Sequence, residues 1–498
     1  MVQSVLIVGG GSAGWITANL LNAHCRRTGR DTRITLVESP DIPTIGVGEA
    51  TVPTIRRTLN DIGLPEQDFL ESTEATFKTL IRFENWNLGE TYDHPFDRRP
   101  RPQSDAAAGV WTAENGLPFD RHFSVLTQLA DFNIAPKSPR HPQYQASFPY
   151  AYHLDAIKLA ARLSRFGQEN GIQHRLGNVI DVAVSSEGLV TGVKTDRGDT
   201  LTADLYVDCS GFRSVLLGGA LGVPVRSFEK HLLCDRAVTM RVPYDVHKPE
   251  RILTYTKATA RDAGWQWDIN LQSRRGIGYV YSSKFLEDDA AETALRQYEG
   301  VHCETLEARH IRFSSGKREV SWKGNCVAVG LSDGFLEPLE SSGLYLIEFA
   351  GLAIANMLAD FESAPQATMR YYNRITNDLY DEILGFLNLH YVISNRRDTA
   401  FWRAATSDEV IVDDLRDRLE LWKRRGPGQF DFPGADRLFA RDSYEFILHG
   451  MKYVRGEPDS RVNIPDLSGP VMKARSELPE HEMFLSLVQR AAEARSSS

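Results

Sequence analysis

The chain has 498 residues, and its 57 basic and 66 acidic side chains leave a net charge of −9 with histidines neutral. Its 42% apolar and 25% charged residues are typical of a folded globular protein. The length corresponds to roughly three domain-sized parts. The acidic balance argues against a general nucleic-acid binder.

The cysteines and the start of the chain indicate a cellular compartment. Five cysteines are scattered and never spaced as CxxC, which predicts reduced, mostly buried thiols rather than a disulfide framework or a zinc site. No basic and apolar leader precedes the first expected strand, and no window approaches about 18 uninterrupted apolar residues. We therefore expect a cytoplasmic protein with no membrane span and no metal centre.

The hydrophobic pattern predicts alternating strands and helices at the start of the chain. A short apolar strand at residues 5–8 leads through glycines into a helix at 13–25, and a second strand follows at 32–38. Residues 65–80 again have helical spacing. Prolines interrupt nearly every window of residues 89–148, which predicts long loops over a pocket with one short helix at about 123–131.

The remaining elements follow the same kind of pattern. In order, they are an amphipathic helix at 153–170, strands at 179–184, 190–195, 199–202 and 205–209, a strand-rich region at 225–320, and helices from Gly343 to about Arg425.

The first glycine turn has the spacing of a dinucleotide-binding site. Gly9, Gly11 and Gly14 form GxGxxG between a strand and a helix, so the helix amides, with Ser12 and Ala13 at its start, face a pyrophosphate. Glu38 ends the next strand and is placed to accept hydrogen bonds from a ribose. A glycine turn that merely packs is the alternative, and the strand, helix and acid around the turn argue against it.

A second glycine–acid segment lies far downstream. Residues 327–334 read VAVGLSDG, with Gly330 and Asp333 after an apolar run. Binding through two distant segments suits FAD, whose adenosine half takes the first turn while Asp333 meets the ribityl and flavin half. A plain NAD dehydrogenase needs no such returning segment. The pattern therefore favours FAD over NAD.

Several longer motifs together resemble the flavin-dependent tryptophan halogenase family. They are GVGEATVP at residues 46–53, DCSGFRS at 208–214, GWQWDI at 264–269, FLEPLESSG at 335–343, LHY at 389–391 and FWR at 401–403. The similarity runs from Val2 to about Arg403 and implies an α/β fold. That fold is a Rossmann-type FAD-binding module of the flavin monooxygenase superfamily, with a mixed sheet and a largely helical C-terminal part.

The resemblance implies a reaction that spacing alone does not reveal. A separate NAD(P)H-dependent flavin reductase supplies reduced FAD, which with oxygen and chloride or bromide yields hypohalous acid. The oxidant passes to a lysine, Lys78 by similarity, beside an electron-rich aromatic substrate. Glu340, with Ser341 beside it, stabilises the arenium intermediate and accepts its proton. Ser342 and Gly343 would bind the halide ion with backbone N–H groups at a helix start.

The resemblance also implies which residues surround the cofactor and the substrate. Ala50, Val179, Leu336 and Leu344 join the cofactor-binding set. The substrate side takes His94, Phe96, Trp265, Trp267 and Tyr444, with the two tryptophans walling the substrate away from the flavin. Asn270 stands where the family has proline, which frees a backbone N–H and lowers rigidity at the end of this wall.

Other interpretations of these residues stay open. Taken alone, Lys78 would be a solvated helix lysine, the two tryptophans core packing and His94 a hydrogen-bonded structural histidine. The alternative function is a flavin-dependent aromatic hydroxylase that oxygenates its substrate directly, and a third is a non-catalytic FAD-binding partner protein.

The extent of each domain is a coarse expectation. Residues 1–360 are expected to form the FAD-binding core, to which 89–148 and 216–320 add substrate-side loops and sheet, and residues 361–498 a helical part covering the substrate. Within the core, the FAD module itself draws on three separate stretches of the chain. The substrate, whether tryptophan, indole or another arene, the preferred halide, the regiochemistry and the oligomeric state, with a homodimer as one alternative, are left open by the sequence.

Overall fold

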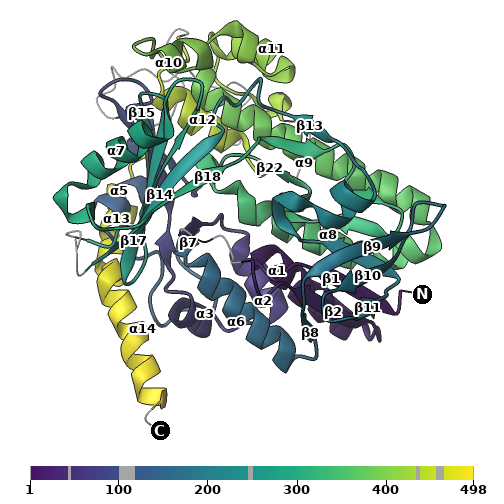
Figure 1. The fold of residues 1–498 in the computed structure, drawn as a ribbon. Helices are drawn as coiled ribbons and strands as arrows, with labels where there is room; N and C mark the ends of the chain where they lie inside the picture. The colour runs from purple at the N-terminus through teal and green to yellow at the C-terminus, as the bar shows by residue number, and fades with distance from the viewer. Residues whose placement is uncertain are drawn as a thin grey trace. The chain divides into compact units, whose positions relative to one another are not determined.

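The computed structural model describes residues 2–42, 46, 48–99, 118–244, 251–432, 438–455 and 465–496 (Figure 1). Two units emerge from its contacts. The first comprises Met1–Glu74, Leu154–Phe228 and Ser314–Asp381, and the second comprises Ala75–His153, Glu229–Phe313 and Glu382–Ser498. The division falls within helix α9 (Pro365–Val392) rather than at the expected boundary after residue 360. Residues 100–117 of the expected proline-rich loops lie outside the described residues.

A six-stranded sheet forms the centre of the first unit. Its order is β20 (Trp322–Lys323), β21 (Cys326–Ala328), β12 (Leu205–Asp208), β1 (Ser4–Val8), β2 (Arg33–Glu38) and β8 (Gln173–Leu176). All neighbours are parallel except β20 and β21. The continuous apolar run of β1 follows from this position, because a central parallel strand is covered on both faces.

Helices cover one face of this sheet and a small sheet covers the other. Helix α1 (Ser12–Thr28) packs against α2 (Ile55–Ile62), α6 (Ala156–Glu169) and α8 (Ser342–Ser363). On the opposite face, Leu6 and Val8 share a core with Val190 and Val193 of the three-stranded sheet. That sheet is β9 (Val179–Val184), β10 (Val190–Thr195) and β11 (Thr200–Leu201).

Helix α8 is the most apolar helix of this unit. Its length and composition alone would suffice to cross a membrane, and half of its most apolar stretch is buried in the protein. Because it packs along α1 next to the sheet, we interpret it as the core helix of the first unit.

A seven-stranded sheet forms the centre of the second unit. Its order is β18 (Ala308–Arg312), β14 (Arg236–Pro243), β17 (Arg274–Tyr281), β16 (Gly264–Asn270), β15 (Tyr255–Arg261), β5 (Leu80–Glu84) and β6 (Thr91–Pro95). Helix α7 (Asp288–Glu299) covers one face, where its Ala291 and Leu295 pack on Ile277, Tyr279 and Tyr281 of β17.

Shorter elements complete the two units. They are β3 (Glu49–Ala50), α3 (Glu66–Ser72), β4 (Thr76–Lys78), α4 (Phe119–Phe123), α5 (Val125–Asp131), β7 (Ala151–Leu154), β13 (Val225–Ser227), β19 (Gly316–Arg318), β22 (Gly334–Phe335), α10 (Ala400–Ala405), α11 (Asp413–Trp422), α12 (Arg441–Gly450), α13 (Ser468–Glu477) and α14 (His481–Ser496).

Two expectations about local structure are wrong. The helical spacing of residues 65–80 ends after α3, and the chain continues as strands β4 and β5. The buried Thr76 and Thr79 are β-branched and favour extended backbone once both faces are covered. The proline-rich stretch also contains strand β6, where Pro95 is tolerated as the last residue of an edge strand.

Candidate active site

The glycine turn after β1 has the geometry that a dinucleotide requires. Gly9 has φ +120°, and a Cβ there would lie 2.2 Å from the carbonyl oxygen of Cys209. A Cβ at Gly14 would lie 1.9 Å from the carbonyl oxygen of Gly9, so this glycine lets α1 pack on the turn. At Gly11 a Cβ would meet nothing within 4 Å, which leaves the backbone open to a phosphate group.

The other predicted cofactor residues of the turn lie beside it. Ser12 is the first residue of α1, and a Cβ at Gly330 would lie 3.0 Å from the Cβ of Ala13. The downstream segment therefore reaches the N-terminal turn, as two-segment FAD binding requires. The Glu38 carboxylate lies against Gly10 and accepts a hydrogen bond from His174 Nε2 at 2.9 Å. The residues of the turn fit an FAD molecule.

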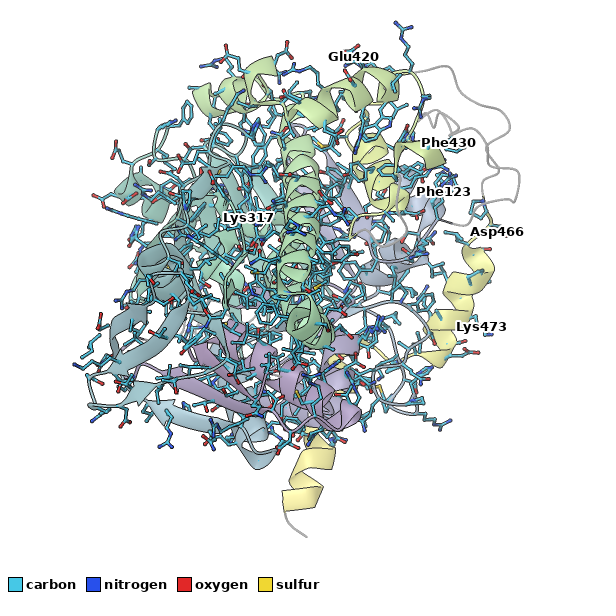
Figure 2. The ribbon with its side chains drawn as sticks, turned by 90° about the vertical axis from the view of Figure 1, so that its right-hand side faces the viewer. Phe123, Lys317, Glu420, Phe430, Asp466 and Lys473 are labelled. Carbon is cyan, nitrogen blue, oxygen red and sulfur yellow. The ribbon has the colours of Figure 1, made fainter. Side chains whose placement is uncertain are left out.

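The structure places the Asp333 carboxylate beside a buried lysine that the sequence did not single out. Asp333 Oδ1 lies 3.8 Å from Lys317 Nζ, and the Lys317 side chain, labelled in Figure 2, is 0% exposed. Lys317 Nζ also donates to Ser321 Oγ at 2.7 Å, and it lies 5.4 Å from the centroid of the Tyr380 ring. Burial lowers the pKa of Lys317 and raises the pKa of Asp333, and each charge opposes the shift of the other.

The segment from Glu340 to Leu344 leads into helix α8. Glu340 is buried, Ser341 takes the left-handed conformation with φ 60°, and α8 begins at Ser342. Ser342 Oγ is buried without a hydrogen-bond partner among the described residues. A Cβ at Gly343 would meet nothing within 4 Å. An open helix start with an unpartnered hydroxyl suits a small anion such as halide.

Four predicted cofactor residues are apolar and belong to the same unit. Leu336 and Leu344 are buried, and Ala50 in β3 is half-buried. Val179 begins β9 and packs against the core cluster between the two sheets, so it has a packing role whether or not it reaches a cofactor.

Trp265 and Trp267 project from the sheet face opposite to α7 in the second unit. They pair with Val280 and Gly278 of β17, which alternate with the residues that pack on α7. The two ring centroids lie 6.1 Å apart. A Cβ at Gly278 would lie 2.2 Å from the Trp267 ring, so the indole lies directly over this glycine.

His94 lies on the same face of the sheet. His94 on β6 pairs with Ile81 on β5, and Ile81 pairs with Thr256 on β15. Thr256 is two residues before Ala258, which is the β15 partner of Trp267. Because paired residues share a face, this row places His94, Thr256 and the two tryptophans on one side.

Lys78 is buried rather than solvated. Its side chain has 0% exposure, and its Nζ lies 5.2 Å from the centroid of the Phe96 ring. The Phe96 N–H donates to the Thr79 carbonyl at 3.0 Å, which keeps Phe96 next to the strand that carries Lys78. An amine in such a position, shielded from water and facing an aromatic ring, differs from the surface lysine that a helix would present.

Strand β4, which carries Lys78, is held by residues that the sequence did not identify. Gln272 donates from Nε2 to the Ala75 carbonyl at 2.8 Å, and the Phe77 N–H donates to His481 Nε2 at 3.1 Å. Burial lowers the pKa of His481 to about 4, so the ring is a neutral acceptor near neutral pH. No local pattern links these positions, since His481 lies 404 positions after Phe77.

Tyr444 and Asn270 have mainly structural contacts in this unit. Tyr444 is buried on α12 and packs on Phe386, which in turn packs on His94 at 5.7 Å between ring centroids. Asn270 is the last residue of β16, and its side-chain Oδ1 accepts from the Leu253 N–H at 3.3 Å. An amide at this position thus anchors a neighbouring segment, which proline could not do.

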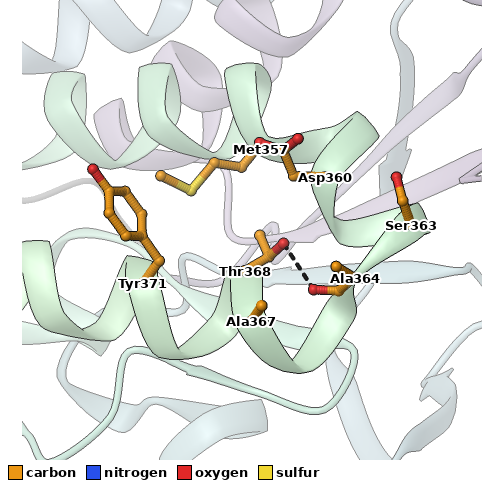
Figure 3. Close-up of a pocket in the computed structure, with 7 residues that line it drawn as sticks. All are labelled: Met357, Asp360, Ser363, Ala364, Ala367, Thr368 and Tyr371. Atoms are coloured by element: carbon orange, nitrogen blue, oxygen red, sulfur yellow. Dashed lines mark hydrogen bonds between the residues drawn. The ribbon is translucent and has the colours of Figure 1, made fainter.

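A cavity of about 320 Å³ lies where α8 and α9 meet (Figure 3). It contains none of the predicted site residues and offers a single carboxylate, that of Asp360. Its lining is Met357, Asp360, Ser363, Ala364, Ala367, Thr368 and Tyr371. We assign it no catalytic role.

The predicted residues thus form two groups, one in each unit. The glycine turns, Glu38, Asp333 and the residues 340–344 belong to the first unit, and Lys78 with the aromatic residues belongs to the second. All five cysteines are buried, as expected, and no disulfide joins any of them within the described part of the chain.

Comparison with known proteins gives one consistent answer. The sequence matches the tryptophan halogenase family over residues 4–465. It is 38% identical to the tryptophan 6-halogenase SttH of Streptomyces toxytricini, over 93% of this chain and 92% of that protein. It is 33% identical to the tryptophan 7-halogenase RebH of Lentzea aerocolonigenes, over 93% of this chain and 92% of that protein.

The solved structures agree with the sequence matches. Tar14, a tryptophan C-6 flavin-dependent halogenase (chlorinase) from taromycin biosynthesis, superposes with a TM-score of 0.90 at 35% identity, over 98% of this chain and 100% of that chain. These matches support halogenation and do not favour the hydroxylase alternative. The chain belongs to the tryptophan halogenase family and is an FAD-dependent halogenase.

Proposed function

We propose that the enzyme halogenates tryptophan or a closely related indole, with Lys78 as the residue that activates the oxidant. The observation that carries this proposal is the burial of Lys78 beside Phe96, in the unit whose sheet face carries His94, Trp265 and Trp267. The relatives SttH and RebH are named for halogenation of tryptophan, which supports an indole as the substrate.

The first unit holds the cofactor and the halide in this proposal. Gly9, Gly11 and Gly14 accommodate the pyrophosphate, and Glu38 accepts hydrogen bonds from the ribose. Bound reduced FAD would supply two electrons. Together with oxygen, a halide ion and a proton, it would give oxidised FAD, hypohalous acid and water. The N–H groups of Ser342 and Gly343 bind the halide ion at the start of α8.

The side chains of Lys78 and Glu340 act on the arene. Lys78 Nζ either donates a hydrogen bond to hypohalous acid or takes the halogen, and both make the halogen a stronger electrophile. The arene carbon attacks the halogen and forms an arenium ion. The halogen–oxygen bond breaks, and the hydroxide takes a proton from the Lys78 amine group and leaves as water. Glu340 accepts the ring proton as aromaticity returns, which balances the proton that Lys78 gave up.

Three further features of the proposal concern its setting. A separate NAD(P)H-dependent flavin reductase supplies reduced FAD by diffusion, and the enzyme works in the cytoplasm as a homodimer. Light scattering on the purified chain measures the last of these directly.

The test is an assay with a flavin reductase, NADH, FAD, bromide or chloride, and a panel of L-tryptophan, indole and a phenol. We expect Lys78→Ala to lower halogenated product by about 100-fold or more, because the amine that positions the halogen is gone. The Lys78→Ala variant should still form hypohalous acid, which is measured as halide-dependent halogenation of a soluble β-diketone. Mass spectrometry reports product, halogen and scaffold together.

Lys137→Ala is the matched control. Lys137 is also buried, and its Nζ lies 5.7 Å from the centroid of the Tyr150 ring, but the proposed reaction does not use it. Its variant should keep product formation. Undiminished halogenation by Lys78→Ala would contradict the role of Lys78, and hydroxylated product formed without halide would contradict the proposed reaction.

A further inference from the structure

His153 is a buried histidine of the second unit that the proposed reaction does not use. It has 0% exposure and lies on β7. Its Nδ1 lies 3.3 Å from Thr76 Oγ1 and its Nε2 lies 2.8 Å from Thr256 Oγ1. Both ring nitrogens are therefore hydrogen-bonded to side chains from other strands.

The direction of these hydrogen bonds follows from the partners. Thr76 donates its only hydroxyl proton to the Asn270 carbonyl at 2.6 Å, so its oxygen accepts from His153 Nδ1–H. Nε2 then carries the lone pair and accepts from the Thr256 hydroxyl. The chain of bonds runs from Thr256 through His153 and Thr76 to Asn270, and it requires a neutral imidazole.

The environment keeps the imidazole neutral. Burial, with the positive charge of Lys78 and the nearby His481 ring as smaller causes, lowers the pKa of His153 well below its ordinary value. Lys78 comes from β4 and His481 from α14.

The His153–Thr76 step of this chain of hydrogen bonds lies next to Lys78. Thr76 and His153 are direct partners across β4 and β7, and Lys78 pairs with Ala151 two residues along the same strands. Thr76 and Lys78 point to the same side of β4, so the imidazole and the Lys78 side chain are diagonal neighbours. Asn270 ends the strand that carries Trp265 and Trp267.

We propose that His153 is a positioning residue for Lys78. It ties β4 to β15 through Thr256 and, through Thr76, to the end of the tryptophan-bearing strand β16. The Lys78 amine is thereby held in a fixed position relative to Trp265 and Trp267, and the neutral His153 beside it adds no second positive charge. The proposal rests on the proposed role of Lys78, because a displacement of about 1 Å costs on the order of 100-fold only where Lys78 acts on the reacting halogen.

The test compares His153→Leu with His153→Gln in the full enzyme, with reduced FAD, bromide and L-tryptophan or indole. We expect His153→Leu to lower kcat for brominated product and the product formed per hypobromite by about tenfold or more. KM for the arene should change less than twofold. Hypobromite captured by a soluble β-diketone should stay at the wild-type level. His153→Gln should recover most of the product, because its amide can donate to Thr76 and accept from Thr256.

Threonine variants give a second, independent measurement. Thr256→Val removes the donor to His153, and we expect a smaller loss of product per oxidant in the same direction. Thr239→Val is the matched control, since Thr239 is also buried on β14 and, among the described residues, its hydroxyl donates to the Arg309 carbonyl and not to a histidine. If His153→Leu does not fold by circular dichroism, Thr256→Val decides the question.

The outcomes separate the two proposals. The positioning role alone would be overturned if both His153→Leu and Thr256→Val form the wild-type amount of product per hypobromite while Lys78→Ala abolishes product. An equal loss of product and oxidant in His153→Leu would also overturn it, because that result points to damaged folding. Undiminished product in Lys78→Ala would overturn the role of Lys78 and this proposal with it.

Discussion

At the scale of single residues, the ion pair of Lys317 and Asp333 gives the acid of the second glycine segment a structural partner in addition to its predicted role at the cofactor. The acid of the second glycine segment was expected to meet the ribityl chain of FAD. In the structure its carboxylate lies next to a buried lysine, which also donates to the Arg318 carbonyl at 3.0 Å. A buried charge needs its partner more than an exposed one does.

We expect Asp333→Asn to lower the free energy of unfolding by about 3–5 kcal/mol, because it leaves the Lys317 ammonium buried without a counter-charge. Urea unfolding of the apoprotein measures this loss. The double variant Lys317→Met with Asp333→Leu should regain most of the stability. If Asp333 also binds the cofactor, both variants will weaken FAD binding in a fluorescence titration. An unchanged urea midpoint for Asp333→Asn would contradict the importance of the pair.

Gly278 is a second residue whose role comes from one contact, that with the Trp267 ring. Gly278→Ala should displace this indole, because the new methyl group would lie 2.2 Å from the ring. We expect a loss of stability of about 1–3 kcal/mol and lower product per hypohalous acid. Tryptophan fluorescence and the bromination assay measure the two effects. Gly469→Ala, where a Cβ meets nothing within 4 Å, is the control. Wild-type values in both assays would show that the ring moves without cost.

At the scale of elements, strand β4 carries Lys78, and helix α8 begins with the proposed halide-binding residues Ser342 and Gly343. Residues 75–77, of which Thr76 and Phe77 belong to β4, are hydrogen-bonded to Gln272, Asn270 and His481, and these distant partners fix the position of the three-residue strand. In α8, Glu348 is buried one turn after Leu344, and Thr58 of α2 donates to its Oε2 at 2.6 Å. Burial raises the pKa of Glu348 to about 8.

The pKa of Glu348 predicts a pH-dependent stability. Between the unfolded pKa of 4.5 and the folded pKa of about 8, the folded state keeps a proton that the unfolded state has lost. Stability therefore falls as pH rises through this window. Glu348→Gln should remove a loss of about 3–4 kcal/mol in the free energy of unfolding between pH 5 and pH 8. Thermal unfolding at both pH values measures it, with Glu187→Gln on an exposed turn as control. An equal pH slope in wild type and Glu348→Gln would contradict the shift.

At the scale of the whole molecule, buried histidines have the opposite effect to Glu348: they make the folded protein less stable as the pH falls. Burial lowers the pKa of His449 to about 3 and that of His481 to about 4, and it holds that of His153 well below its ordinary value. The unfolded chain protonates these rings below about 6.5, whereas the folded protein does not. Their contribution to stability is present above pH 6.5 and is lost as pH falls toward 4.

Replacement of one ring should change the slope of that loss. Between pH 6.5 and 4.5, His481→Gln should lower the dependence of the unfolding free energy on pH by about 1.4 kcal/mol per pH unit. Its absolute stability is expected to fall, since the bond to the Phe77 N–H weakens, so the slope is the quantity to compare. Urea unfolding at pH 4.5, 5.5 and 6.5 gives it. Parallel curves for wild type and variant would show that His481 is already protonated.

Much of the cofactor-binding turn could be predicted because its geometry is local. Gly9, Gly11 and Gly14 lie within six positions, and Gly14 avoids a clash with Gly9 of the same turn, although Gly9 also makes room for the distant Cys209 carbonyl. The strand–turn–helix order and the family were likewise correct from the sequence, since their signals are runs of neighbouring residues. The same local logic failed for residues 73–80, where helical spacing gave way to a buried strand.

The amino-acid sequence by itself determined the family and the fold class, and it singled out Lys78, the lysine that we propose as the reactive one. Only the tertiary structure decided that Lys78 is buried on a strand and that Asp333 faces Lys317. It alone joined His153 to Thr256, which lies 103 positions away in the chain. The physical reason is that burial and hydrogen bonds between distant strands depend on how sheets pair, and residue periodicity carries no record of those partners.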